Sequence, residues 1–364
     1  MNRLVIAAAG SGKTRLIIES ALGAVRSGKR VLITTFTEAC ASEIHERIIE
    51  ANGSVPKNLY VVTWFTFLIR HGVKPFQGQL FDFEVKGLLL VNGQSAPFSK
   101  ESDIAKHFFT AGQYIYSDKL AKLVIKCDEA SAGMVFRRIE KCFDCVFIDE
   151  VQDLAGYDLE VLDKLFKCQA EVTMVGDPRQ ATYSTNNAKK HSKYKKANIL
   201  NFFADNDMGV ETDDKILQTN FRCTQAICNL ANTLYPNLAS AASGNDVASG
   251  HDGVFLLCIE ETSHYLQCFH PMQLRDNKRT SINEGWDVMN FGKSKGMTLN
   301  RVLIYPSGPM LKWLIDPGYD LGQAARSKLY VALTRAKQSV AIVVKKNDLA
   351  KIRRLPQYIV LDGK

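Results

Sequence analysis

The segment Ala7–Thr14 places the strongest constraint on what this chain can fold into. It reads Ala-Ala-Ala-Gly-Ser-Gly-Lys-Thr and follows an apolar run, Leu4–Ile6, that is typical of a buried strand. Apolar residues recur at helical spacing after it, so the pattern predicts a strand, a small-residue loop and a helix. Backbone N–H groups of such a loop, with the positive end of the helix, bind phosphate oxygens. Lys13 is predicted to reach the β- and γ-phosphates, and the Thr14 hydroxyl to ligate Mg²⁺.

A glycine turn with a lysine on the surface is the alternative interpretation of this segment. Position 7 is alanine where the phosphate-binding pattern usually has glycine, so the match is incomplete. The strand before the loop and the helix after it nevertheless favour a nucleoside triphosphate site. The residues expected to hold the nucleotide are Ala9, Gly10, Ser11, Gly12, Lys13 and Thr14.

Two adjacent carboxylates end another apolar strand. The run Cys145–Ile148 is typical of a buried strand, and Asp149 and Glu150 follow it directly. Open α/β sheets place their ligand chemistry at this end of their strands. Alone, a strand ending in two acids is usually only a solvated strand end, but the phosphate loop favours a catalytic role. Asp149 is predicted to contact Mg²⁺, directly or from its outer sphere, and Glu150 to orient the water that attacks the γ-phosphate.

A third strand with polar residues at its end follows. After 172–176 come Asp177 and Gln180, which are expected to sense the γ-phosphate and its attacking water. The basic run Lys189–Lys196, which includes one tyrosine, lies shortly beyond. Such a run fits a solvated loop and a contact to a phosphate backbone about equally well.

The composition is that of a folded chain long enough for two domains. The 364 residues are 46% hydrophobic, and the net charge of +8 permits a polyanionic partner without demanding one. No run of about 18 apolar residues occurs, so no membrane-spanning helix is expected. Because the chain enters the phosphate loop almost at once, no signal peptide is expected. Nine cysteines in a nucleotide-binding chain favour a reducing, cytoplasmic location.

Strand and helix patterns alternate along both halves of the chain, which predicts an α/β fold with parallel sheets. Residues 1–205 are expected to form a first domain, with a helical insertion at about 71–140 where strand signals are weak. Residues 206–364 are expected to form a second domain, without a phosphate loop but with several arginines and lysines. A second domain that presents arginines to a nucleotide on the first is the arrangement of a two-domain motor.

Taken together, these segments resemble the motif series of superfamily 1 DNA helicases of the UvrD/Rep type. The matching segments, in the family's order, are Ala7–Thr14, Thr35–Arg47, Thr63–Phe67, Ile148–Asp153, Val175–Tyr183, Asn220–Arg222, Lys293–Met297 and Leu329–Lys337. The resemblance spans nearly the whole chain. It implies two RecA-like parallel-sheet motor domains with an ATP cleft between them, and ATP and Mg²⁺ as cofactors.

The resemblance also implies roles for residues of the second half. Arg222 and Arg335 would act as arginine fingers that stabilise charge on the transferring phosphoryl group. Phe221 stands where the family usually has tyrosine and would stack on adenine. Lys295 and Gly296 would lie near the γ-phosphate or the DNA backbone. In the first half, Arg15 would be a second neighbour of the base.

Four residues fall at positions that face single-stranded DNA in the family: Phe36, Thr63, Phe65 and Tyr183. Lys189 and Lys190 are expected to join them as backbone contacts. Stacking on an aromatic ring contributes roughly 1–3 kcal/mol per base and tolerates any sequence, which suits a motor that walks along a strand.

Several positions depart from the family pattern. Thr185 stands where a tryptophan platform is expected, Gly292 where a histidine is expected, and Thr298 where a glutamate is expected. The glutamine that reads adenine in the family would precede the phosphate loop, so selection for adenine is expected to be less strict than triphosphate binding. Large accessory insertions are also missing.

Two functions follow from this pattern. The first is an ATP-dependent translocase or helicase on single-stranded DNA, moving 3′ to 5′, compatible with a motor subunit of a larger nuclease, repair or defence complex. The alternative is a nucleotide-switched regulatory subunit of a partner nuclease, with little unwinding of its own. The compact form, Thr185 and Gly292 motivate the alternative.

Overall fold

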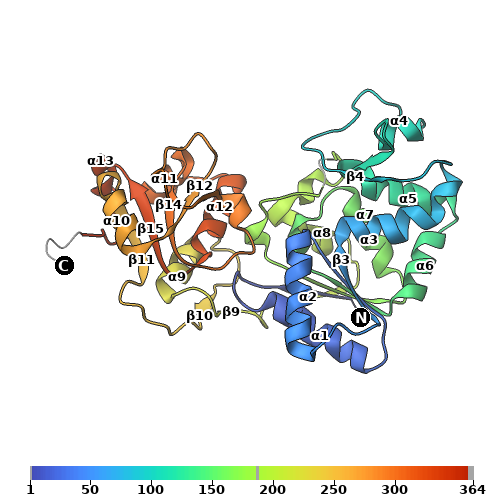
Figure 1. Cartoon of the computed structure of the whole chain (residues 1–364), viewed down its shortest axis with the longest axis horizontal. Coiled ribbons are helices and arrows are strands. Elements are labelled where there is room, and N and C mark those ends of the chain that lie inside the picture. The colour runs from blue at the N-terminus through green and yellow to red at the C-terminus, as the bar shows by residue number, and fades with distance from the viewer. Residues whose placement is uncertain (1, 186–187, 360–364) are drawn as a thin grey trace. The chain divides into compact units, whose positions relative to one another are not determined.

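The computed structural model describes residues 2–185 and 188–359, which separate into two compact units (Figure 1). Unit 1 is formed by residues 2–6, 13–178 and 183–213, and unit 2 by 7–12, 179–182 and 214–359. Nearly all of the phosphate-loop segment therefore groups with unit 2, while Lys13 and Thr14 belong to unit 1. In the described residues, no helix is long and apolar enough to cross a bilayer.

Unit 1 is built on a parallel six-stranded sheet with the order β3-β2-β6-β7-β1-β8. Its strands are β1 (Asn2–Ile6), β2 (Val31–Thr35), β3 (Leu59–Thr63), β6 (Cys145–Ile148), β7 (Glu171–Gly176) and β8 (Val210–Asp213). Every residue of β2 and β6 is buried, because helices cover both faces of a parallel sheet. The register pairs Thr34 of β2 with Ile148 of β6, so these two strands end side by side.

Among the helices of unit 1, α2 (Glu38–Asn52) has a capping residue at each end. Further helices of this unit are α1 (Lys13–Arg26), α3 (Trp64–Phe67), α7 (Tyr157–Phe166) and α8 (Ile199–Asp205). The Thr37 hydroxyl accepts the N–H of Cys40 and starts α2, and Gly53 ends α2 in the left-handed conformation at φ 79°. The buried face of α2 carries Ala41, Ile44 and Ile48 at helical spacing.

The insertion of unit 1 is not purely helical, which corrects the sequence prediction for 71–140. It contains α4 (Ile104–Phe108), α5 (Leu120–Ala130) and α6 (Met134–Cys142), but also a small parallel sheet of β4 (Gly87–Leu89) and β5 (Tyr114–Tyr116). Strands of three residues are too short to show the alternation that identifies a strand in sequence. Figure 1 shows α4 and β4 at the end of unit 1 remote from α1.

Unit 2 contains a parallel five-stranded sheet with the order β11-β15-β14-β12-β13. Its strands are β11 (Gly253–Cys258), β12 (Met272–Arg275), β13 (Val288–Asn290), β14 (Leu299–Tyr305) and β15 (Ala336–Val344). Its helices are α9 (Gln225–Thr233), α10 (Thr262–Phe269), α11 (Gly308–Ile315), α12 (Gln323–Leu333) and α13 (Lys346–Leu349). A short pair, β9 (Thr219–Asn220) and β10 (Ala242–Ser243), lies outside this sheet.

The two parallel sheets confirm the predicted α/β class. The first sheet continues past residue 205, where the sequence places the end of the first domain, because β8 pairs with β1 from Asn2↔Val210 to Val5↔Asp213. Strand β8 reads Val-Glu-Thr-Asp and is an edge strand with two exposed residues, so it lacks the apolar run that marks the inner strands.

Candidate functional site

The phosphate-loop segment has the backbone that its glycines predict. Gly10 and Gly12 adopt φ values of 71° and 91°, in the left-handed region that glycine enters without strain. The Ser11 hydroxyl donates to the Ala8 carbonyl at 2.7 Å and closes the turn. Ala7 is only 1% exposed, so the position that departs from the usual glycine is packed inside the fold.

Two residues of unit 2 that we did not single out from the sequence, Asn220 and Tyr330, lie against this loop. The Ala9 N–H donates to the Tyr330 hydroxyl at 3.3 Å, and the Phe221 N–H donates to the Gly10 carbonyl at 3.0 Å. A Cβ atom on Gly10 would lie 2.6 Å from Oδ1 of Asn220, so only glycine fits there. Asn220 and Tyr330 lie inside matched motif segments, which was the available signal for them.

Lys13 and Thr14 open helix α1 in unit 1. Lys13 is 9% exposed. The first turn of α1 carries no acidic residue, so no carboxylate of that turn neutralises the positive end of the helix dipole. This arrangement suits an anion at the helix start. Arg15 lies on the exposed surface of α1 and forms an ion pair with Glu19 at 2.7 Å.

The two carboxylates follow β6 as predicted, and the backbone at Glu150 is unusual. The Asp149 N–H donates to the Thr34 carbonyl at 2.8 Å, and the Asp149 side chain accepts the Glu150 N–H at 2.9 Å. Glu150 adopts φ 56° and ψ 41°, a left-handed conformation that costs a residue with a side chain about 1–3 kcal/mol. Such backbone strain concentrates at functional sites, where it aims a side chain.

Gln152 connects Glu150 to the end of β7, and although it lies in the matched segment Ile148–Asp153, we did not predict this role from the sequence. Its amide nitrogen donates to the Glu150 carboxylate, and its amide oxygen accepts the Asp177 N–H at 3.0 Å. Gln152 is 1% exposed and Asp177 is 0% exposed. A Cβ on Gly176 would lie 2.5 Å from the same amide oxygen, so glycine is needed beside it. The base candidate is therefore held by a buried amide.

Asp149 and Thr14 together offer the ligand types that Mg²⁺ prefers. Mg²⁺ in phosphoryl-transfer sites is usually held by one or two protein oxygens, with phosphate oxygens and water completing an octahedron. One carboxylate and one hydroxyl of unit 1 fit that pattern. No group of three or more His, Cys, Asp or Glu side chains suited to a metal ion occurs in the part of the chain that the structure describes.

The arginines of unit 2 are engaged with protein acceptors. Arg335 is 1% exposed and donates to the carbonyls of Val331 at 3.0 Å and Met297 at 3.2 Å. It also donates to the side-chain oxygen of Gln180 at 3.0 Å, which brings two predicted site residues together. Arg222 donates to the Thr334 carbonyl at 3.1 Å. Either guanidinium would have to exchange these bonds to meet a phosphate.

Phe221 presents an exposed aromatic ring in unit 2. Its ring is 64% exposed although its backbone is bonded to the phosphate loop. Lys295 and Gly296 follow a short helical turn, Phe291–Ser294, and Gly296 adopts φ 86°. The hydrogen bond from the Phe221 N–H to the Gly10 carbonyl keeps Phe221 next to the loop.

Three aromatic side chains of unit 1 gather beyond the ends of β2 and β3. The rings of Phe36 and Tyr183 are stacked with centroids 5.9 Å apart, and Phe36 lies 5.9 Å from Phe65. Tyr183 is 38% exposed, so this aromatic cluster reaches the surface. Thr63, the fourth predicted DNA contact, is 5% exposed, and its hydroxyl accepts the Thr66 N–H at 3.2 Å to cap α3.

Thr185 and the start of the basic run lie on the same segment as Tyr183. The Thr185 side chain is 5% exposed and bonds to Asp158 and to the N–H of Ala155, so it is part of the core. Lys190 is half-exposed and forms an ion pair with Glu160 at 3.2 Å, and Lys189 is exposed. Among the described residues, position 185 therefore supplies no stacking platform.

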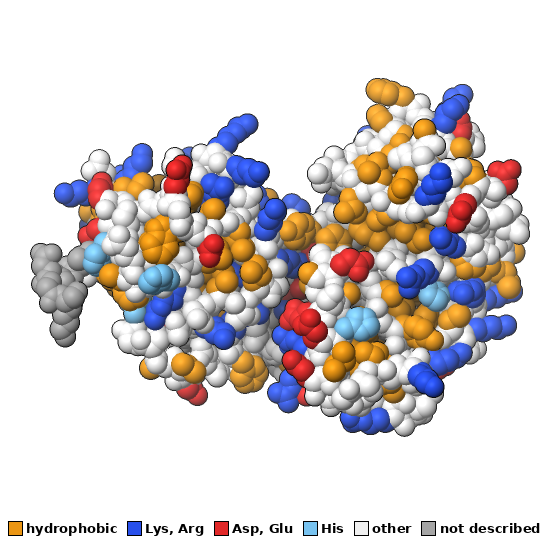
Figure 2. All heavy atoms as spheres, in the orientation of Figure 1, with side chains coloured by type: hydrophobic (Ala, Val, Ile, Leu, Met, Phe, Trp, Pro, Cys, Tyr) orange, Lys and Arg blue, Asp and Glu red, His pale blue; other side chains and the backbone are white. Residues whose placement is uncertain are grey.

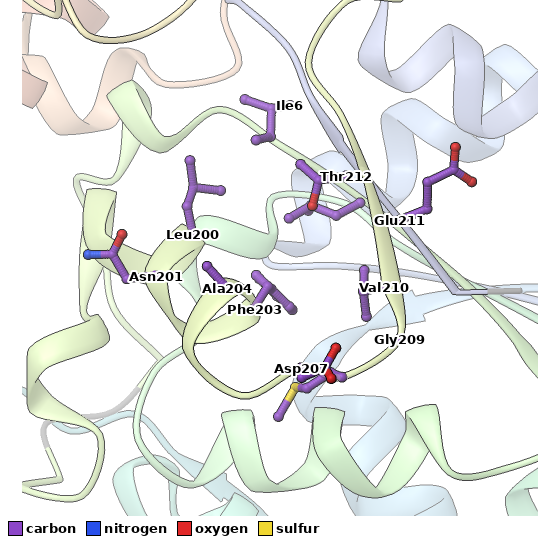
Figure 3. A pocket seen from close by; sticks show the side chains of 12 residues that line it. Ile6, Leu200, Asn201, Phe203, Ala204, Asp207, Gly209, Val210, Glu211 and Thr212 are labelled. Atoms are coloured by element: carbon purple, nitrogen blue, oxygen red, sulfur yellow. The ribbon is translucent and has the colours of Figure 1, made fainter.

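A cavity of about 860 Å³ also lies in unit 1, between α8 and the strands β1 and β8 (Figure 3). Its apolar wall includes Leu4, Ile6 and Phe203, and its charged lining residues are Asp207 and Glu211. No lysine or arginine is among the described residues that line it, so a phosphate chain would find no cation there. None of the predicted site residues lines this cavity.

Comparison with known families covers both units. A family model described as "AAA domain" matches residues 1–186. A model described as "viral superfamily 1 RNA helicase core domain" matches residues 133–344. Each match spans more than half of the 364 residues.

Curated relatives and solved structures give more distant matches. The chain is 27% identical to the Gabija protein GajB of Bacillus cereus (strain VD045) over 241 residues, 64% of this chain and 46% of that protein. It is 26% identical to the ATP-dependent DNA helicase PcrA of Leuconostoc citreum over 283 residues, 64% of this chain and 36% of that protein. The chain thus spans less than half the length of these two relatives. A solved structure titled as a complex of arterivirus nonstructural protein 10 (helicase) with DNA gives a TM-score of 0.49 at 15% identity, over 97% of this chain and 63% of that one.

Proposed function

Because the chain belongs to the superfamily 1 helicases, we propose that it is an ATP-driven translocase or helicase on single-stranded DNA. ATP with Mg²⁺ is the energy source in this proposal, and the aromatic cluster is a contact surface for the strand. Movement from 3′ to 5′ is proposed from the resemblance to the UvrD/Rep type.

The observation that carries the proposal is the order of groups along one edge of the first sheet. The aromatic cluster follows β2 and β3, the two carboxylates follow β6, Asp177 follows β7, and the phosphate loop follows β1. In the sheet these strands run in the order β3-β2-β6-β7-β1, and all are parallel. Neighbouring strands lie about 4.8 Å apart. The aromatic cluster and the two carboxylates therefore lie at the ends of neighbouring strands of the unit 1 sheet, so a proposed DNA contact and part of the proposed phosphate chemistry share one edge of that sheet.

The thiol of Cys40 lies near enough to the two carboxylates to feel their negative charge. Cys40 lies in the first turn of α2, four residues after Phe36. Burial raises the pKa of its thiol, and the negative charges of Glu150 and Asp149 add to that effect. The carboxylates thus act on the same segment that carries an aromatic contact.

The proposed chemistry assigns one task to each group. Lys13 and the loop N–H groups hold the phosphates, Thr14 and Asp149 hold Mg²⁺, and Glu150 positions water for in-line attack. Arg222 and Arg335 are the proposed arginine fingers, which requires them to exchange their present carbonyl partners during turnover.

ATP hydrolysis with and without nucleic acid tests this proposal. We expect turnover to rise many-fold with single-stranded DNA, and less with duplex DNA or RNA. Lys13→Ala should abolish turnover by removing the phosphate contact, while Arg26→Ala, at an exposed position in the last turn of the same helix, should retain it. Turnover that no nucleic acid changes would contradict the proposal.

One observation favours a second candidate, a nucleotide-switched subunit that regulates a partner nuclease. Thr185 belongs to the core and replaces the aromatic platform that the resemblance implies for strand separation. This candidate keeps ATP binding but predicts little unwinding. A strand-displacement assay on the isolated chain separates the two, because efficient unwinding without a partner excludes the second candidate.

A further inference from the structure

A small basic pocket in unit 1 lies between the insertion and the basic run. Its volume is about 280 Å³, and its lining includes Lys119, Lys122, Lys189, Lys190 and the ring of Tyr157. We call these five residues the lysine pocket. They come from the start of α5, the start of α7 and the segment after residue 187, so the fold brings together charges that are far apart in the chain.

The pocket carries an excess of positive charge. Four lysines and one acidic residue, Asp118, line it, and Glu101 and Glu160 form ion pairs with Lys122 and Lys190, which leaves a formal excess of one (four minus three). Both oxygens of Asp118 accept bonds from Ser95, at 2.9 Å from its N–H and 2.6 Å from its hydroxyl. Burial lowers the pKa of the lining residue His107, and Lys119 lowers it further, so this ring adds no charge near neutral pH.

The cations are held in place by the protein. Lys119 is 6% exposed, and its ammonium donates to the His107 carbonyl at 2.8 Å. The ammonium groups of Lys122 and Lys190 each lie 5.2 Å from the centroid of the Tyr157 ring. Placing Lys119 and Lys122 at the start of α5 is unfavourable for the helix dipole, and that helix start has no side-chain cap. Glu101 pairs with Lys122, and an anion in the pocket would add a negative charge beside Lys119 and the helix start.

Size and chemistry select the class of anion. Sites that enclose drug-sized ligands measure roughly 300–1,000 Å³, so this pocket suits a phosphate with part of its sugar better than a whole nucleotide. On the face of unit 1 in Figure 2, basic and acidic side chains are interspersed rather than gathered in one stripe. Attraction of a phosphate to this unit would therefore depend on local groups of lysines.

We propose that the lysine pocket binds a backbone phosphate of the single-stranded nucleic acid that the aromatic cluster contacts. The inference rests on the proposed function and adds a second contact to it. Tyr183 of the cluster and Lys189 of the pocket are six residues apart in sequence, a span of at most about 20 Å. One strand can therefore reach both sites, with a base on the rings and a phosphate among the lysines.

The salt dependence of DNA binding tests this inference. Fluorescence anisotropy with a labelled oligothymidylate over a series of NaCl concentrations gives the slope of log K against log [salt]. Each phosphate contact contributes about 0.7 to that slope for a single strand. The variant K189Q/K190Q should bind more weakly, and its slope should be smaller in magnitude by about 0.7 for the one phosphate released.

The matched control is K193Q/K196Q, which removes the same charge from the same basic run outside the pocket lining. Its slope should stay near that of the unmodified chain, and both variants should keep the wild-type melting temperature. Equal slopes for the two variants, with wild-type DNA binding intact, would overturn the lysine pocket alone. No binding of the oligonucleotide by the unmodified chain would overturn the proposed function and the inference together.

Discussion

Replacing Gln152 with leucine tests whether the buried amide holds the catalytic base. Leucine has a similar size but neither donates to Glu150 nor accepts from the Asp177 N–H, whose bond to Gln152 measures 3.0 Å. Because Asp177 is 0% exposed, its N–H would lose its amide partner out of reach of water. Leaving a buried donor unsatisfied costs about 1–3 kcal/mol.

That free energy translates into measurable changes in stability and rate. For a unit of this size, 1 kcal/mol shifts the melting temperature by about 2–4 °C, so Gln152→Leu should lower it by about 2–12 °C. Positioned general-base catalysis contributes about 10²–10⁴-fold, and we expect kcat for ATP hydrolysis to lose part of that factor, at least about 10-fold. KM for ATP should change little, because Gln152 acts on Glu150 and not on the nucleotide.

Scanning fluorimetry and steady-state ATPase kinetics measure both effects. Gln169→Leu is the matched control, because it makes the same chemical change at an exposed position of the same unit. It should leave the melting temperature and kcat near wild type. A Gln152→Leu variant with unchanged melting temperature and unchanged kcat would refute a positioning role for this amide.

Two further predictions concern DNA binding and acid stability. Phe36→Ala or Tyr183→Ala should weaken binding of an oligothymidylate by roughly 1–3 kcal/mol, about 5- to 150-fold in Kd; an equal Kd for both variants and wild type in a binding titration would contradict the aromatic cluster. Burial, together with the nearby positive charges of Arg138 and Arg70, lowers the pKa of His71 from its ordinary 6.5 to about 4, and the guanidinium of Arg138 lies 2.9 Å from Nδ1. The unfolded chain therefore binds the extra proton first, so this residue's contribution to stability is complete above about pH 6.5 and is lost as the pH falls toward about 4. Melting temperatures of wild type and His71→Gln should converge over that range, and parallel curves would speak against the assignment.

Much of the first sheet could be predicted from sequence because its inner strands are continuous apolar runs. Cys145–Ile148 and Val31–Thr35 are buried on both faces, and each leads directly into a site segment. The ends of such strands meet at one sheet edge, so the carboxylates could be assigned to it in advance, whereas the aromatic residues were expected only from the resemblance. Strand β8, with its polar sequence, gave no comparable signal and extends the sheet beyond residue 205.

The bonds that hold the site could not be predicted, because they depend on contacts between distant segments. Asn220 and Tyr330 meet the phosphate loop more than 200 residues away in sequence. Gln152 joins the ends of two strands, and the register of the sheet decides which backbone N–H it meets. The hydroxyl of Thr63, a predicted DNA contact, also caps α3, a role that only the local backbone reveals.

The central claim is that ATP hydrolysis drives movement along single-stranded DNA. Displacement of streptavidin from a biotinylated oligonucleotide measures that movement directly, with biotin at either the 5′ or the 3′ end. We predict ATP-dependent displacement from the 5′ end, little from the 3′ end, and none with Lys13→Ala or Glu150→Gln. If neither end is cleared while ATP is hydrolysed and DNA is bound, the chain is not a translocase and the claim is wrong.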